Sequence, residues 1–193
     1  MCHSTVELTM IFTYERDLLS DAFHRKNIAL RVQRDPRTRL RKNLLLGCPF
    51  QHVRYSIIKN GTVDFDAGHK DRYGVLTPDD LASLYCYLYL PRHHAELLST
   101  FDRCSTWIDD VLIPGRSTWL VDLGCGPGTA GLAFADHCRG VPFHYIGFDR
   151  STAMQPTAQS LLNEARHSGL IDCESKFAMS SGMFDPARSP GLS

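Results

Sequence analysis

The pattern of hydrophobic and polar positions changes character near residue 113. Before that point, apolar residues recur at helical spacing over 5–23 and in a shorter basic segment over 28–32, which Pro36 should stop. Further along, the β-rich runs 53–58 and 62–65 flank Asn60-Gly61, a pair that favours a two-residue hairpin turn. The pattern predicts a mainly helical region over 1–113 with one hairpin near 53–65.

The clearest helix of this region begins at Thr77-Pro78-Asp79-Asp80. Thr77 is a good N-cap, proline suits the first helical position, and two acids favour the positive end of the helix dipole. Pro91 is expected to end or bend this helix. The sequence RHHAELLSTFDRC then predicts another one.

From residue 114 onward, strand and helix patterns alternate. Strands are predicted at 119–123, 143–149 and 173–181, with helices over 128–138 and 154–165 between them. The apolar run 119–123 is typical of a parallel strand buried on both faces, and Thr152 with Gln155 is expected to cap the second helix. The fold class expected for 114–193 is α/β, a Rossmann-like doubly wound parallel sheet that is truncated after about the third strand.

Acidic residues interrupt or end the first two of these strands, at Asp122 and Asp149. Carboxyl ends of strands are where open α/β sheets bind ligands, and an acid there can accept hydrogen bonds from both ribose hydroxyls of a nucleoside. The glycines at 126, 128 and 131 also fit G-x-G-x-x-G, so a nicotinamide or flavin dinucleotide is an alternative. Pro127 stands against it, since a pyrophosphate needs free amides nearby. A turn without any ligand is a further alternative.

The motifs VDLGCGPGT and YIGFDRSTAM resemble the first two motifs of class I S-adenosylmethionine-dependent methyltransferases. The resemblance covers about 119–165. It implies S-adenosyl-L-methionine as the cofactor, a glycine loop around its methionine and ribose, one acid on the methionine amino group and one on the ribose. The residues that take these parts are Gly124, Cys125, Gly126 and Gly128 in the loop, Asp122 and Asp149 as the acids, and Arg150 and Met154 beside the adenosine.

A second, looser resemblance lies upstream. The stretch LTPDDLASLYCYLYLPRHHAELLSTFDR is similar to the helical lead-in of ribosomal small-subunit methyltransferase-like proteins of mitochondria and bacteria, which implies an RNA partner. The acceptor-side motif of the methyltransferases, an Asn/Asp-Pro-Pro-aromatic element, has no counterpart, because FDPARSP at 184–190 reads as a turn. Enzymatic activity is therefore left open. A non-catalytic assembly protein on a truncated methyltransferase fold, with a protein partner at its sheet edge, is the alternative.

No catalytic base is assigned from the sequence. Tyr14, Asp79 and His94 are candidates to reach over the cofactor from the N-terminal part, and Ser180 or Ser181 is a candidate to contact the base. A methyl acceptor is not specified by any motif.

Charge is unevenly distributed, although the net charge is zero. Residues 1–60 hold eleven Lys and Arg against five Asp and Glu, and the rest hold ten against sixteen. Eight basic residues and one acid, Asp35, lie between Arg25 and Lys42. Such a cluster attracts phosphates, which makes RNA a possible partner and acceptor. A solvated helix face is the other interpretation, since no aromatic residues are interleaved.

The remaining composition favours a cytoplasmic protein without membrane contact. No run of about 18 apolar residues occurs, and the N-terminus lacks the pattern of a signal peptide. Seven cysteines are scattered without a C-x-x-C pair, which is typical of reduced thiols. No metal is expected, because the adjacent His93 and His94 would point about 100° apart on a helix.

Overall fold

The computed structural model describes residues 23–59, 63–113 and 118–181. Its elements, in chain order, are η1 (Arg25–Ala29), α2 (Leu30–Arg34), α3 (Pro36–Arg39), β1 (Leu44–Leu45), β2 (Cys48–Pro49), α4 (Phe50–His52), η2 (Val53–Ile58), β3 (His69–Asp71), β4 (Gly74–Leu76), α5 (Pro78–Arg103), α6 (Ser105–Val111), β5 (Trp119–Leu123), α7 (Thr129–His137), β6 (His144–Asp149), α8 (Met154–His167) and β7 (Lys176–Ser181). The two η segments are π-helical. The helix predicted over 5–23 lies almost entirely outside the described residues.

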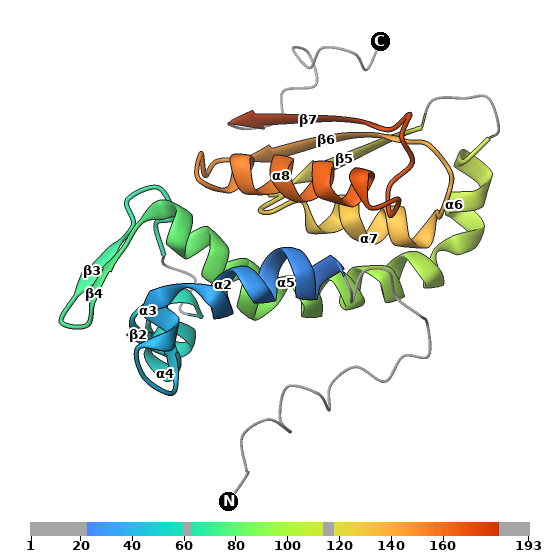
Figure 1. Cartoon of the computed structure of the whole chain (residues 1–193). Helices are drawn as coiled ribbons and strands as arrows, with labels where there is room; N and C mark the ends of the chain where they lie inside the picture. The colour runs from blue at the N-terminus through green and yellow to red at the C-terminus, as the bar shows by residue number, and fades with distance from the viewer. Residues whose placement is uncertain (1–22, 60–62, 114–117, 182–193) are drawn as a thin grey trace, which may run out of the picture.

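A parallel sheet of strands β5, β6 and β7, in that order, organises the second half of the chain. Its register pairs Trp119 with His144 and His144 with Lys176. Helices α7 and α8 make the two crossovers and lie on the same side of the sheet, between it and α5 (Figure 1). Both crossovers advance in one direction, so right-handed connections place both helices on one face. The predicted α/β architecture with a parallel sheet is therefore present.

Strand β5 is more exposed than its apolar sequence predicts. Trp119 is 37% and Leu123 is 63% exposed, and the residues between them are only partly buried. The prediction of a strand buried on both faces is wrong for the described chain. The physical reason is the position of β5, which forms one edge of the described sheet while α7 and α8 cover a single face.

Helix α5 is one continuous helix of 26 residues that passes through Pro91. The prediction that a second helix starts there is wrong. Leu90 and Leu98, on either side of Pro91, are both buried, and their burial offsets the loss of one backbone hydrogen bond. Its predicted start is confirmed, since Thr77 and Asp80 form a capping box. None of the helices in the described part of the chain has the length and apolar character needed to cross a membrane.

The main hydrophobic core contains residues from both sides of position 113. Ile28 and Leu90 come from the N-terminal part, and they share this core with Leu132, Tyr145 and Leu162. Helix α5 packs against both α7 and α8. The N-terminal helices are therefore the outer layer of the sheet half.

The hairpin predicted near 53–65 is wrong. Residues Val53–Ile58 are helical, and Val53, Ile57 and Ile58 are buried in a second core with β4 and the start of α5. Val53 and Ile57 are four residues apart and therefore lie on one helix face. Burial of that face stabilises the helix more than the β-propensity of these residues favours a strand. Residues 63–65 form no strand, and Asn60-Gly61 lies outside the described residues. The hairpin lies later in the chain, where β3 and β4 pair His69 with Leu76 and Asp71 with Gly74.

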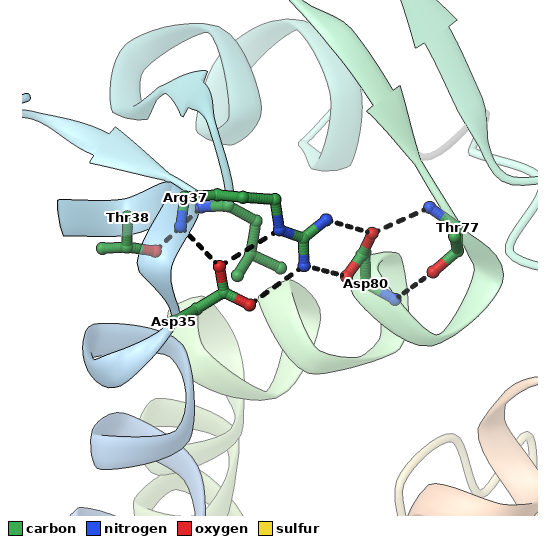
Figure 2. Close-up of polar contacts among 6 residues, drawn as sticks. Asp35, Arg37, Thr38, Thr77 and Asp80 are labelled. Carbon is green, nitrogen blue, oxygen red and sulfur yellow. Dashed lines mark hydrogen bonds and ion pairs between the residues drawn. The ribbon is translucent and has the colours of Figure 1, made fainter. Parts of the chain in front are cut away.

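An arginine joins the basic N-terminal helices to α5. Helix α2 ends before Asp35-Pro36, as predicted, and Asp35 caps α3 by accepting a hydrogen bond from the Arg37 amide. The guanidinium of Arg37 bridges the carboxylates of Asp35 and Asp80, with nitrogen-to-oxygen distances of 2.7–3.1 Å (Figure 2). These hydrogen bonds raise the pKa of Arg37 above its ordinary value. The Arg37 guanidinium therefore stays charged and is used in ion pairs within the protein.

Candidate functional site

A cavity of about 360 Å³ lies between the glycine turn that follows β5 and one side of α5. Asp122, Gly124 and Gly126 line it from the turn, and Cys125 and Pro127 lie beside them. Across from the turn, its wall is formed by side chains of α5. Half of the residues predicted to bind the cofactor therefore meet α5 at this cavity: Asp122, Gly124, Cys125 and Gly126. The other half are not among the residues that line it: Gly128, Asp149, Arg150 and Met154.

The glycine turn leaves room on the ligand side. Gly124 and Gly126 have φ angles of +76° and +50°, and a Cβ at either position would meet nothing within 4 Å. Gly128, with φ +79°, has a different role, because a Cβ there would lie 3.3 Å from Leu162 of α8. The first two glycines therefore open the cavity, and the third allows α7 and α8 to pack closely.

Backbone amides of this turn are engaged within the protein. The N–H groups of Gly124 and Cys125 donate to the Phe148 carbonyl at 2.7 and 3.0 Å. The Gly126 N–H donates to Asp149 Oδ2 at 2.8 Å, and the Gly128 N–H donates to the Cys125 carbonyl. Since Pro127 has no N–H, residues 124–128 retain no amide for a phosphate group.

Asp122 lies at the cavity wall, and one of its carboxylate oxygens is hydrogen-bonded to a buried residue of the next strand. Its Oδ2 accepts a hydrogen bond of 2.8 Å from the hydroxyl of Tyr145, a fully buried residue of β6. Burial raises the pKa of Asp122, the Tyr145 hydroxyl opposes that shift, and the charge of Asp149 adds to it. A cationic ligand group would stabilise the charged form of this carboxylate. Tyr145 is a positioning residue that the sequence pattern did not identify, since it reads there as a core aromatic.

Asp149 connects the glycine turn to the loop before α8. Its Oδ2 accepts from Gly126, and its Oδ1 accepts a hydrogen bond of 2.8 Å from the Ser151 amide. Asp149 follows Phe148, which pairs with Leu123, so the two acids lie at the same end of adjacent parallel strands. The sheet register therefore brings together two residues that are far apart in the sequence.

The loop before α8 is held by Asp66, a residue of the N-terminal half. Its carboxylate accepts hydrogen bonds from the Ser151 hydroxyl, the Thr152 amide and hydroxyl, and the Ala153 amide, at 2.8–3.1 Å. The predicted capping pair of Thr152 and Gln155 is wrong, because no side chain of the helix itself caps α8. No sequence signal could assign this contact, which spans more than 80 residues.

Helix α5 contributes Tyr85, His93, Glu96 and Thr100 to the cavity wall, and the Tyr85 hydroxyl lies 3.4 Å from His93 Nδ1. Among the described residues that line the cavity, none is Lys or Arg. With Asp122 and Glu96 present, the cavity favours cations over anions.

The three candidates for a catalytic base are not brought together at this cavity. His94 is only 3% exposed and packs edge-to-face on His24. Asp79 is exposed in the first turn of α5, and Tyr14 lies outside the described residues. The neighbouring His93 lines the cavity instead, because the phase of α5 turns His93 toward it.

The remaining candidates from the sequence are Cys125, Arg150 and Met154 of the two motifs and Ser181 of β7. Cys125 is buried, and burial raises the pKa of its thiol to about 12, which makes it a poor nucleophile. Arg150 is exposed after β6, and Met154 is buried at the start of α8. Ser181, at the end of β7, pairs with Asp149 in the sheet register.

A scan of the chain against protein-family models finds no match, and a search of curated proteins finds none either.

Proposed function

We propose that the chain binds S-adenosyl-L-methionine and that residues 119–165 are the cofactor-binding half of a Rossmann-like, class I S-adenosylmethionine-dependent methyltransferase domain. The observation that carries the proposal is the pair Asp122 and Asp149, which flank an open glycine turn at the same end of two adjacent parallel strands. Ligands of open α/β sheets bind at that end. The order β5-β6-β7 is that of one half of a doubly wound sheet.

The cavity favours this cofactor over a dinucleotide. A pyrophosphate needs backbone amides or basic side chains. The amides of 124–128 are engaged and the described lining holds no Lys or Arg, so the first amides of α7, at Thr129 and Ala130, are the donors left for it. S-adenosylmethionine has a net charge of +1, because its sulfonium and ammonium outnumber its one carboxylate, and both cations are attracted to the carboxylates of Asp122 and Glu96. The cavity volume of about 360 Å³ is within the range of small-molecule sites.

The residues present fit such a ligand. Asp122, oriented by Tyr145, would hold the methionine ammonium, and the space beside Gly124 and Gly126 admits the ligand next to the backbone. Asp149 lies beside this lining, and its oxygens already accept from the Gly126 and Ser151 amides, so it would accept from the ribose hydroxyls with its remaining lone pairs. The bound cofactor would supply an electrophilic methyl group, and Tyr85 and His93 of α5 are the groups placed to orient an acceptor.

RNA is the acceptor class that the surface supports best. Seven of the eight basic residues between Arg25 and Lys42 are exposed, and only Arg37 is partly buried. The structure also places an exposed aromatic residue among basic side chains, an arrangement that the sequence pattern does not reveal. Tyr55 is 44% exposed, with Arg54 and Lys59 over its ring at 5.3 and 5.2 Å. A base can stack on this ring when one of these side chains moves off it, and the released cation can then meet a phosphate.

Calorimetric titration of S-adenosylhomocysteine into the full chain tests the proposal, with NAD as the ligand control. Saturable binding of the first ligand alone is expected. Asp122→Asn keeps an oxygen for the Tyr145 hydroxyl but removes the charge, and it should weaken binding more than tenfold, whereas Asp109→Asn on α6 should not change it. Equal binding of NAD, or full affinity of Asp122→Asn, contradicts the proposal.

A non-catalytic interaction protein is the second candidate, and the exposed edge strand β5 favours it. Leu123 and Trp119 present apolar surface at that edge, which suits pairing with another polypeptide. Incubation with labelled S-adenosylmethionine and total RNA separates the two functions. Methyl transfer supports the enzyme, and its absence, together with a stable complex formed through this edge, supports the interaction protein.

A further inference from the structure

Three metal-ligating side chains converge outside the cavity, where the β3–β4 hairpin meets α4. His52 is the last residue of α4, and His69 and Asp71 belong to β3. Both rings direct Nε2 at the same oxygen, Asp71 Oδ2, at distances of 2.5 Å for His52 and 3.0 Å for His69. The three ligand atoms all lie within 4.8 Å of one another.

The backbone holds these side chains in place. His69 and Asp71 are two positions apart on a strand, so they project from the same face. The amide of Tyr73 donates a hydrogen bond of 2.7 Å to Asp71 Oδ1, which leaves Oδ2 for the histidines. The Tyr73 ring lies 4.7 Å from that of His52 and limits its rotation. The hairpin turn thereby orients two of the three ligands, as outer-shell groups do in metal sites.

Two imidazole nitrogens and one carboxylate oxygen form a donor set for Zn²⁺ and related first-row divalent ions, whereas Ca²⁺ and Mg²⁺ prefer oxygen alone. Tetrahedral ligand atoms around zinc lie roughly 3.3 Å apart. Each histidine nitrogen therefore needs to move away from Asp71 Oδ2 by less than about 1 Å, and the two nitrogens already lie within 4.8 Å of each other. A carboxylate offers about four acceptor positions, so hydrogen bonding alone would allow the two histidines to use different oxygens of Asp71. Their convergence on Oδ2 is the arrangement that a shared metal ion needs. The side chains are 20–32% exposed, which gives an ion and its water access.

We propose that His52, His69 and Asp71 bind one divalent transition-metal ion of the zinc class, with water completing its coordination. The ion joins the β3–β4 hairpin to α4, two segments separated by the chain between residues 53 and 68. The proposal departs from the expectation from the sequence that the chain has no metal site, which was argued from His93 and His94 alone. The cluster is distinct from the cavity, so the proposal does not depend on cofactor binding.

Zinc titration of the full chain, after removal of metal with a chelator, tests the proposal by calorimetry. Binding of one equivalent is expected, with a rise in the thermal midpoint. Co²⁺ should bind with the visible absorption of a low-symmetry nitrogen and oxygen site. His69→Gln should weaken Zn²⁺ binding at least tenfold and abolish both the thermal shift and the Co²⁺ spectrum.

Matched controls separate this site from other ligands of the chain. His167→Gln replaces an exposed histidine of α8, and Cys173→Ser removes an exposed thiol, and both should bind Zn²⁺ as the unaltered chain does. If His69→Gln fails to fold by circular dichroism, His52→Gln carries the same test. The proposal is overturned if the unaltered chain does not bind Zn²⁺ saturably, or if a folded His52 or His69 variant binds it with unchanged affinity.

Discussion

Replacement of Asp66 by alanine probes how the N-terminal half supports the candidate site. The Asp66 carboxylate caps α8 through Ser151, Thr152 and Ala153, immediately after Asp149. Asp66→Ala removes every one of these acceptors. The backbone amides of Thr152 and Ala153 then lose their partner, and only water can replace it.

The expected loss is about 1–2 kcal/mol in the free energy of unfolding, which is the range for removal of an N-cap side chain. Asp66 is itself exposed, so water partly compensates and the upper end is a limit. For a chain of this size, the melting temperature should fall by about 2–4 °C for each kcal/mol. Asp66→Asn keeps one acceptor oxygen and should lose less.

Urea unfolding followed by circular dichroism measures this loss, with Asp110→Ala on α6 as the control for removing an exposed acid. A pH series adds a second readout. Hydrogen bonds, that of the Ala153 amide first, lower the pKa of Asp66 below its ordinary value of 3.8. A lowered folded-state pKa stabilises the fold above about pH 4, and this contribution is lost as pH falls through the folded pKa. The difference between Asp66→Ala and the unaltered chain should therefore shrink below about pH 4.

An Asp66→Ala variant as stable as Asp110→Ala at pH 7 would refute the reasoning. A difference that persists undiminished in acid would also contradict it, because the protonated carboxyl no longer accepts these bonds as a charged group.

Two further predictions concern packing and charge. Gly131→Ala should lower the free energy of unfolding by about 1–3 kcal/mol, because its Cβ would lie 2.9 Å from the buried Tyr145 ring. Ser160→Ala, on the exposed side of α8, should leave that free energy unchanged in the same urea assay. Changing Arg39, Arg41 and Lys42 together to Gln should reduce the salt slope of single-stranded RNA binding by about 2. Arg37→Gln should leave that slope unchanged and lower the urea midpoint, because Arg37 is bonded to Asp80 within the fold. A smaller slope for Arg37→Gln, with an unchanged slope for the triple variant, would contradict the roles given to these residues.

Local signals in the sequence were sufficient for much of the sheet half. The strand 119–123 and the start of α5 at Thr77 appear where they were predicted, and the apolar line from Met154 to Ala165 is buried as expected. These features depend on short-range causes: a capping box, glycines that accept positive φ, and helical periodicity on one buried face. Asp122 and Asp149 could be proposed as a pair because parallel strands end at a common edge.

Contacts between distant segments decided three features of the fold and the site that the local sequence does not specify. Burial of Val53, Ile57 and Ile58 on one face made a helix of a segment whose residues favour strands, and packing carried α5 through Pro91. The phase of that helix selected His93 rather than His94 for the cavity.

The most consequential contacts join residues that no spacing rule connects. Asp66 holds the loop before α8, Tyr145 orients Asp122, and His52 of α4 meets Asp71 of the β3–β4 hairpin. Burial of apolar side chains fixes the distances between the elements, and those distances decide which donors each carboxylate can reach. The sequence by itself determined which residues can carry charge and hydrogen bonds, and the packed structure determined which of them meet.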